Sequence, residues 1–75
     1  MIRTPYEAGL VLRSIREQQG LTQVQLAERA QVSPRWLVNF EGGKTSVDMS
    51  RVMDCFQALG YAMDIQELPP RNPQS

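Results

Sequence analysis

Apolar residues recur along most of this chain at intervals of three and four positions, the spacing of amphipathic helices. On this basis we predict four helices, over about residues 5–19, 23–30, 34–41 and 49–59. Each follows a residue whose side chain can cap a helix, namely Thr4, Thr22, Ser33 and Asp48. Two of these caps are followed three residues later by Glu7 and Gln25, which is the spacing of a capping box. The predicted core-facing residues are Ala8, Val11, Leu12, Ile15, Leu26, Ala27, Ala30, Leu37, Phe40, Met49, Val52, Met53, Phe56 and Leu59.

The second and third predicted helices are joined by a very short connection. Only Gln31 and Val32 separate them, too few residues for the third helix to return antiparallel to the second. Pro34 is suited to the first turn of the third helix because its ring presets φ. A break this short predicts a helix-turn-helix, a motif whose second helix enters the major groove in DNA-binding proteins.

After Gly60 the apolar period changes from three or four residues to two. Tyr61, Met63 and Ile65 alternate with other residues, so residues 61–68 are predicted to form a strand. A single strand leaves a row of unpaired N–H and C=O groups, which recruits another chain. Residues 1–3 could serve as a very short partner, but the same strand of a second copy, antiparallel across a two-fold axis, satisfies the backbone better. We therefore predict a homodimer with these three apolar residues in its interface.

The composition allows one domain and excludes several classes of protein. The chain has 75 residues, which we divide into a domain at 1–68 and a disordered proline-containing tail at 69–75. Its single cysteine, Cys55, cannot form an intrachain disulfide and is expected in the core. Histidine is absent, and neither a metal-ligand cluster nor a nucleophile–base pair is evident, so we expect no metal, no cofactor and no enzymatic activity. No apolar run approaches the roughly 20 residues of a membrane span, and no signal peptide is evident, so a cytoplasmic protein is expected.

The net charge is zero, which argues against a nucleic-acid binder until its distribution is considered. Residues 1–45 carry six basic and four acidic side chains, a net charge of +2. Residues 46–75 carry two basic and four acidic side chains, a net charge of −2. DNA binding would then depend on a local basic patch and on contacts to base edges.

The chain resembles the Xre/Cro family of phage-repressor-type helix-turn-helix proteins. The resemblance lies in Leu12-Arg13, Ile15-Arg16, Gly20-Leu21-Thr22-Gln23, Leu26-Ala27, Val32-Ser33 and Glu41-Gly42-Gly43-Lys44. The fourth helix ending in Ala58-Leu59-Gly60, followed by a strand, is similar to the HipB-type antitoxin branch. The implied fold is mostly α, a lambda-repressor-like four-helix domain with one C-terminal strand that pairs across a homodimer. The sequence departs from the family at Gln31, where a glycine is usual in a left-handed turn.

Helical angles and the resemblance together indicate which residues would contact DNA. At about 100° per residue, Arg35, Val38 and Asn39 point away from the core side of the third helix, beside Pro34 at its start. The family's base-reading positions correspond to Pro34, Arg35 and Asn39. Arginine can pair with guanine and asparagine with adenine, although both residues could also be ordinary solvated surface.

Further contacts are expected to the DNA backbone. The candidates are Arg13, Gln23, Ser33, Trp36, Lys44 and Thr45. For Gln23 the alternative is a capping role, and for Trp36 it is partial packing on the core. Arg16 and Glu41 match two family positions that form a structural ion pair between the first helix and the end of the third.

Three functions follow as hypotheses. By resemblance, the chain is a dimeric repressor that binds an inverted-repeat operator and acts as the HipB-like antitoxin of a HipA-type kinase toxin, repressing its own operon. The alternatives are a stand-alone Xre-type repressor and a protein-interaction adaptor that has lost DNA binding.

Overall fold

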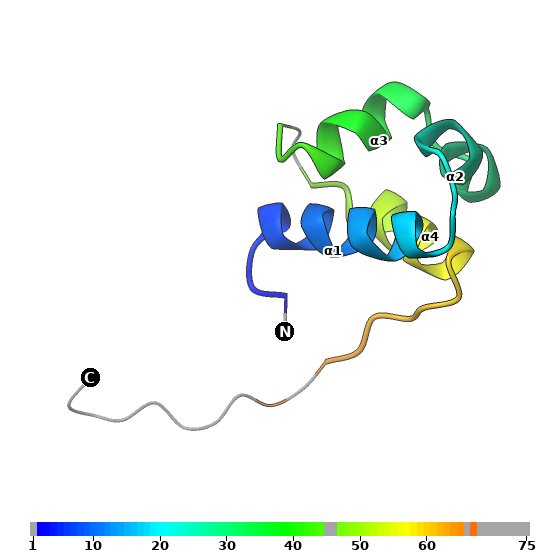
Figure 1. Cartoon of the computed structure of the whole chain (residues 1–75). Helices are drawn as coiled ribbons and strands as arrows, with labels where there is room; N and C mark the ends of the chain where they lie inside the picture. Colours follow the sequence, from blue (N-terminus) through cyan, green and yellow to red (C-terminus); the bar gives the residue numbers. More distant parts are fainter. Residues whose placement is uncertain (1, 45–46, 66, 68–75) are drawn as a thin grey trace.

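The computed structural model describes residues 2–44, 47–65 and 67 and contains four helices (Figure 1). They are α1 (Pro5–Gln18), α2 (Gln23–Ala30), α3 (Pro34–Glu41) and α4 (Met49–Ala58). The four predicted helices are confirmed, with α1 and α4 each one residue shorter than expected. Within the described residues, no helix is both long and apolar enough to cross a membrane.

Capping side chains fix where the helices begin. Thr22 accepts a hydrogen bond from the Gln25 N–H at 3.1 Å, and Gln25 Oε1 accepts one from the Thr22 N–H at 2.9 Å, which completes a capping box. At α1 only half of the expected box forms. Thr4 accepts from the Glu7 N–H at 3.1 Å, but the Glu7 carboxylate accepts from the Arg3 N–H at 3.4 Å instead of that of Thr4.

The turn between α2 and α3 passes through Gln31 in the left-handed conformation, with φ 59° and ψ 40°. A residue with a Cβ atom adopts this conformation at a cost of roughly 1–2 kcal/mol, which is why glycine is usual there. The turn is held by the Val32 N–H, which donates to the Ala27 carbonyl at 3.0 Å. The non-glycine residue therefore leaves the helix-turn-helix geometry intact.

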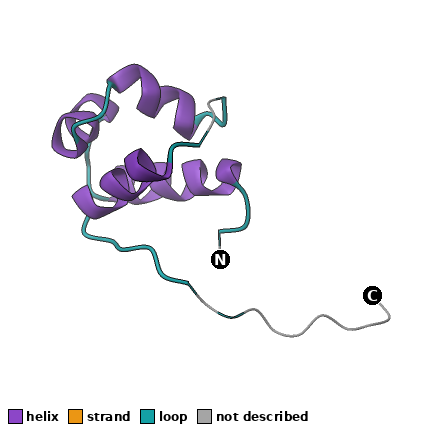
Figure 2. Cartoon of the chain, turned by 180° about the vertical axis from the view of Figure 1, so that it is seen from behind, coloured by secondary structure: helices purple, strands orange, loops and turns teal. Residues whose placement is uncertain are grey.

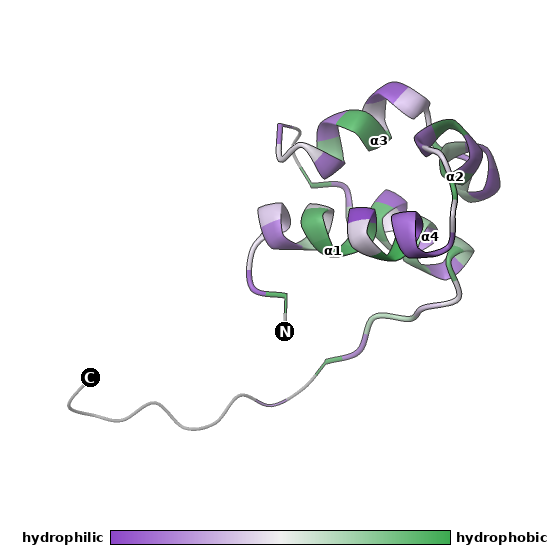
Figure 3. Cartoon of the chain, viewed as in Figure 1, coloured by the Kyte–Doolittle hydropathy of each residue, from purple (hydrophilic) through white to green (hydrophobic). Residues whose placement is uncertain are grey.

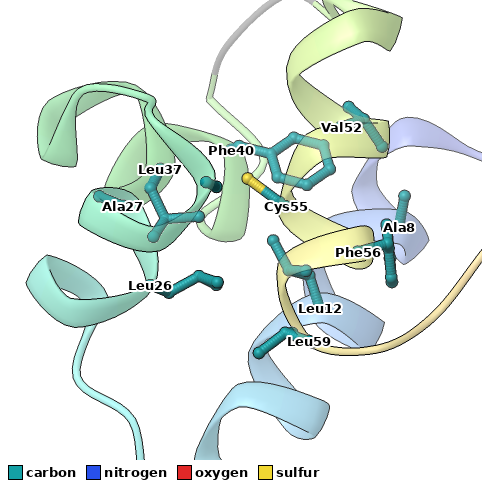
Figure 4. Close-up of a cluster of buried hydrophobic side chains, with 11 residues drawn as sticks. Ala8, Leu12, Leu26, Ala27, Leu37, Phe40, Val52, Cys55, Phe56 and Leu59 are labelled. Carbon is teal, nitrogen blue, oxygen red and sulfur yellow. The ribbon is translucent and has the colours of Figure 1, made fainter.

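One hydrophobic core lies between the four helices (Figure 4). Hydrophobic positions alternate with hydrophilic ones along the helices, and α2 packs against α3 and α4 while α3 packs against α1 (Figure 3). The buried residues are Ala8, Leu12, Leu26, Ala27, Ala30, Leu37, Phe40, Val52, Cys55, Phe56 and Leu59. Cys55 is core material as expected, and burial raises the pKa of its thiol to about 11.

Three residues predicted to be buried are exposed: Val11, Met49 and Met53. On α4 the buried stripe passes through Val52, Cys55, Phe56 and Leu59, so Met53 lies about 100° away from its centre and Met49 extends beyond it at the helix start. On α1 the buried face is rotated away from Val11. It includes Gly9, which faces the Phe40 backbone of α3, and Arg16, which pairs with Glu41 at the end of α3.

Gly9 allows α1 and α3 to approach closely. A Cβ atom at this position would overlap the backbone carbonyl of Phe40, which cannot move without shifting α3. The absence of a side chain therefore sets the distance between α1 and the C-terminal half of α3. The sequence pattern alone does not distinguish this glycine from an exposed one.

The predicted strand does not form in the single chain. Residues 61–65 follow α4 as an extended segment without strand pairing, and the described residues show only helix and loop (Figure 2). The physical reason is that a strand requires a second strand to bond its backbone groups, and residues 2 and 3 of the possible short partner do not pair with it. The described fold is therefore all α. Positions 66 and 68 of the predicted strand, and the predicted tail at 69–75, lie outside the described residues.

Candidate DNA-binding surface

α3 presents an open face beside its buried one. Ser33 caps the helix by accepting a hydrogen bond from the Trp36 N–H at 3.0 Å, and Pro34 occupies the first helical position. Pro34, Arg35 and Val38 are exposed, whereas Asn39 is half-buried at the edge of the same face. The three residues predicted to read bases therefore lie on the outer side of α3, with Pro34 and Arg35 in its first turn and Asn39 in its second half.

Trp36 lies at one border of this open face and shows the partial core packing considered for it. Its ring stacks on that of Phe40, with centroids 5.0 Å apart and planes inclined by 13°. Phe40 is buried, so Trp36 rests on the core while remaining partly exposed. The guanidinium carbon of Arg51, on α4, lies over the Trp36 ring at 6.0 Å from its centroid.

A buried ion pair joins α1 to the end of α3. Arg16 Nε donates to Glu41 Oε2 at 2.8 Å and Arg16 Nη2 donates to Glu41 Oε1 at 2.9 Å, which is a bidentate arrangement. The Arg16 side chain is 9% exposed and the Glu41 side chain 2%. Arg16 Nη1 also donates to the Leu21 carbonyl at 2.7 Å, which fixes the segment that leads into α2. The pair therefore holds three elements in one arrangement.

Gln23, the first residue of α2, belongs to the same network. Its Nε2 donates to Glu41 Oε1 at 3.1 Å, so its side chain is oriented by a buried carboxylate and does not cap the helix. Within the described part of the chain, every buried side-chain nitrogen or oxygen has a hydrogen-bond partner. The start of α2 is thus tied to the last residue of α3, although the two are 18 positions apart.

An open hollow of about 290 Å³ lies between these elements and the other border of α3. Its lining residues are Arg13, Arg16, Gln23, Val38, Glu41 and Gly42. Arg13 is exposed and its Nε donates to Glu17 Oε1 at 2.6 Å. This hydrogen bond lowers the pKa of the Glu17 carboxyl and raises the pKa of Arg13. A guanidinium and an amide therefore flank the open face of α3 on the Val38 side.

The remaining predicted contact residues follow α3. Lys44 is exposed, and its backbone N–H donates to the Asn39 carbonyl at 2.8 Å, which holds it close to the helix end. Thr45, the other residue predicted there, lies outside the described residues. The proposed interface residues Tyr61, Met63 and Ile65 are exposed and lie beyond α4, remote in sequence from this surface.

Sequence reasoning missed Arg51. Its position at the start of α4 carries no motif, and its proximity to α3 depends on a contact between residues 15 positions apart in the chain. The one local signal was a basic residue three positions after the capping residue Asp48, with which it pairs at 3.5 Å. A pair with that spacing is common on helix surfaces and did not indicate a contact with another helix.

Comparison with known proteins agrees with this architecture. Residues 7–67 match a family described as a helix-turn-helix domain. The chain is also similar to an uncharacterized HTH-type transcriptional regulator, y4mF, of Sinorhizobium fredii. The two are 38% identical over 64 residues, which cover 85% of this chain and 84% of the relative.

Proposed function

We propose that this chain is a dimeric repressor that reads an inverted-repeat operator with α3. The chain belongs to the helix-turn-helix domain family of DNA-binding transcriptional regulators. The observation that carries the proposal is the outer face of α3. Arg35 is exposed there in the first turn, at the end of the helix that enters the groove first, and Asn39 lies half-buried at the edge of the same face. Arginine can donate two hydrogen bonds to guanine and asparagine can pair with adenine, while Pro34 and Val38 fit against thymine methyl groups.

The residues around α3 would hold the DNA backbone. Gln23 supplies a second amide hydrogen beyond the one donated to Glu41, at the start of α2 where backbone N–H groups are free. Arg13 lies across the same hollow, and Ser33, Trp36 and Lys44 lie in or next to α3. Thr45 is the next residue in the sequence. The net charge of +2 in residues 1–45 favours modest affinity for any DNA, with sequence preference coming from the base contacts.

The direct test is a gel-shift titration of the full-length protein against the DNA immediately upstream of its own coding sequence. A repressor of its own operon should bind this duplex at least a hundredfold more tightly than a scrambled duplex of equal length. Equal affinity for both duplexes would contradict repression of its own operon.

We further propose that the dimer forms through residues 61–68. Tyr61, Met63 and Ile65 are exposed in the single chain, and Ile65 is 96% exposed, so an apolar strip follows α4 without cover. Antiparallel pairing of two copies would satisfy the backbone and bury this strip. Met49 and Met53 on the outer side of α4 could extend such an interface. The pairing would also fix the two copies of α3 about 34–36 Å apart, which matches successive major grooves.

Replacing Ile65 with proline should shift the protein toward monomer. Proline removes a backbone donor and fixes φ, so it disfavours a paired strand. Ile65→Val retains the N–H and the branched side chain and is the matched control, expected to remain dimeric. Sedimentation by analytical ultracentrifugation at micromolar concentration distinguishes the two variants. A wild-type monomer would contradict the dimer. An Ile65→Pro dimer that still binds operator normally would exclude the strand and place the interface on α4.

The partner is proposed by resemblance to HipB-type antitoxins: a HipA-type kinase toxin, bound through surfaces away from α3. When co-expressed with a kinase-like neighbouring gene, the chain should co-purify with its product, and the Arg35→Ala variant should do so equally. Loss of the complex in that variant would show that the DNA and kinase surfaces are not separate. A genome neighbourhood without such a gene would favour the stand-alone repressor.

A further inference from the structure

We propose that Arg51 is a further DNA-backbone contact, held beside α3 by Trp36, and that it binds the phosphates on the opposite edge of the major groove from Gln23. The proposal rests on the proposed entry of α3 into that groove. It assigns a contact role to α4, from which the sequence predicted core residues only.

The first observation is the chain of contacts from the core to the Arg51 guanidinium. Phe40 is buried, Trp36 stacks on it at 5.0 Å, and the Arg51 guanidinium carbon lies over the Trp36 ring at 6.0 Å. A cation over the face of a tryptophan is attracted by the ring's negative face. The side chain of Arg51 is nevertheless 52% exposed, so its charge is positioned by α3 and remains accessible.

The second observation is the place of Trp36 on α3. With about 100° between successive residues, Arg35, Val38 and Asn39 form the centre of the open face, and Trp36 follows beyond Asn39. The hollow lined by Arg13 and Gln23 borders the opposite side, next to Val38. A helix lying in the major groove has one sugar-phosphate strand on each side. Gln23 and Arg51 therefore flank α3 where the two strands would pass.

The ion pair of Arg51 with Asp48 is compatible with a contact between Arg51 and a DNA phosphate. Arg51 Nη1 lies 3.5 Å from Asp48 Oδ2, and both side chains are about half exposed, so the pair is weak in water. Asp48 Oδ1 is engaged in capping α4 and accepts from the Ser50 N–H at 3.0 Å. A guanidinium has five N–H donors in a planar fork, so contact with Asp48 and with Trp36 leaves donors for a phosphate.

A purely structural role would give a different outcome from a DNA contact, and matched variants separate them. Arg51→Met retains the apolar stem and loses the charge, whereas Arg51→Lys retains a charge without the planar fork. Arg3→Met removes the same charge from the segment before α1, which lies on the opposite side of α1 from α3 (Figures 1 and 2). The probes are a duplex recovered by the wild-type protein from a randomised pool and an unrelated duplex of equal length.

Arg51→Met should bind both duplexes at least about tenfold more weakly, because a hydrogen bond to a charged group is lost. The plot of log affinity against log salt should lose about one unit of slope per subunit, and the preferred sequence should not change. Arg51→Lys should keep the slope with an intermediate affinity, and Arg3→Met should match the wild type in both quantities.

Two results would overturn the assignment. One is an Arg51→Met protein whose affinity and salt slope equal those of Arg3→Met. The other is a variant that melts at a lower temperature with an unchanged salt slope, which would make the contact with Trp36 a link between helices only. Failure of the wild-type protein to recover any sequence would instead contradict the proposed function itself.

Discussion

Replacing Glu41 with alanine should lower the free energy of unfolding by about 3–5 kcal/mol, because it leaves the buried guanidinium of Arg16 without its carboxylate. The total available is small, since a chain of 75 residues has roughly 4–11 kcal/mol of stability. The same change removes the acceptor that orients Gln23. Urea denaturation followed by circular dichroism measures the loss. The variant should retain little free energy of unfolding at ambient temperature.

Two variants show whether burial is the cause. Glu17→Ala removes a carboxylate that contacts Arg13 at a similar distance on the exposed side of α1, and it should leave the free energy of unfolding nearly unchanged. Glu41→Gln keeps the shape and a carbonyl acceptor without the charge, and its stability should lie between those of alanine and the wild type. If Glu41→Ala and Glu17→Ala cost the same, the buried pair would not hold α1, α2 and α3 together as described.

Replacing Arg35 with alanine should cost roughly 1–3 kcal/mol of DNA-binding free energy for each half-site, and a dimer would lose the contact twice. The reason is the loss of two hydrogen bonds to a base edge, and the preference for one base at that position should weaken with them. Gel-shift titrations against the operator and against duplexes changed at single positions measure both effects.

Lys44→Ala is the comparison for Arg35→Ala, since it removes an exposed cation next to the same helix. A phosphate contact carries no base identity, so this variant should weaken binding to all duplexes about equally and flatten the salt dependence. An Arg35→Ala protein with wild-type affinity for the operator would remove Arg35 from base reading. A changed sequence preference in Lys44→Ala would contradict its assignment to the backbone.

The helices could be predicted from the sequence because their signals are local. Thr22 and Gln25 bond to each other within one turn, and Ser33 and Asp48 bond to N–H groups two or three residues ahead. The positions that failed depend on neighbouring elements. Met53 is exposed because the buried stripe of α4 is set by where α2 lies, which no period within α4 specifies.

The sequence could predict which residues lie on the open side of α3, but not the contacts that connect the site to the other helices. Helical angles placed Arg35 on the open side of α3, because the buried residues of a short amphipathic helix define its other side. The bond from Gln23 to Glu41 and the contact of Arg51 with Trp36 join residues 18 and 15 positions apart. Such contacts follow from the packing angle between helices, which short-range patterns leave undetermined.

The strand shows a different limit. The alternating pattern of residues 61–65 indicates that this segment can form a strand. It does not indicate where the pairing strand comes from, and the structure of a single chain can show only a partner within that chain. The proposal of a dimer therefore depends on a measurement with two copies present, and on DNA whose symmetry reflects theirs.

The most direct test of the account is selection of DNA by the wild-type protein from a pool of randomised duplexes, followed by sequencing of the bound fraction. The account predicts enrichment of an inverted repeat whose half-sites are centred about 10–10.5 base pairs apart, or a multiple of that spacing. Recovery of no preferred sequence would contradict base reading by α3, and recovery of a single site without two-fold symmetry would contradict the dimer.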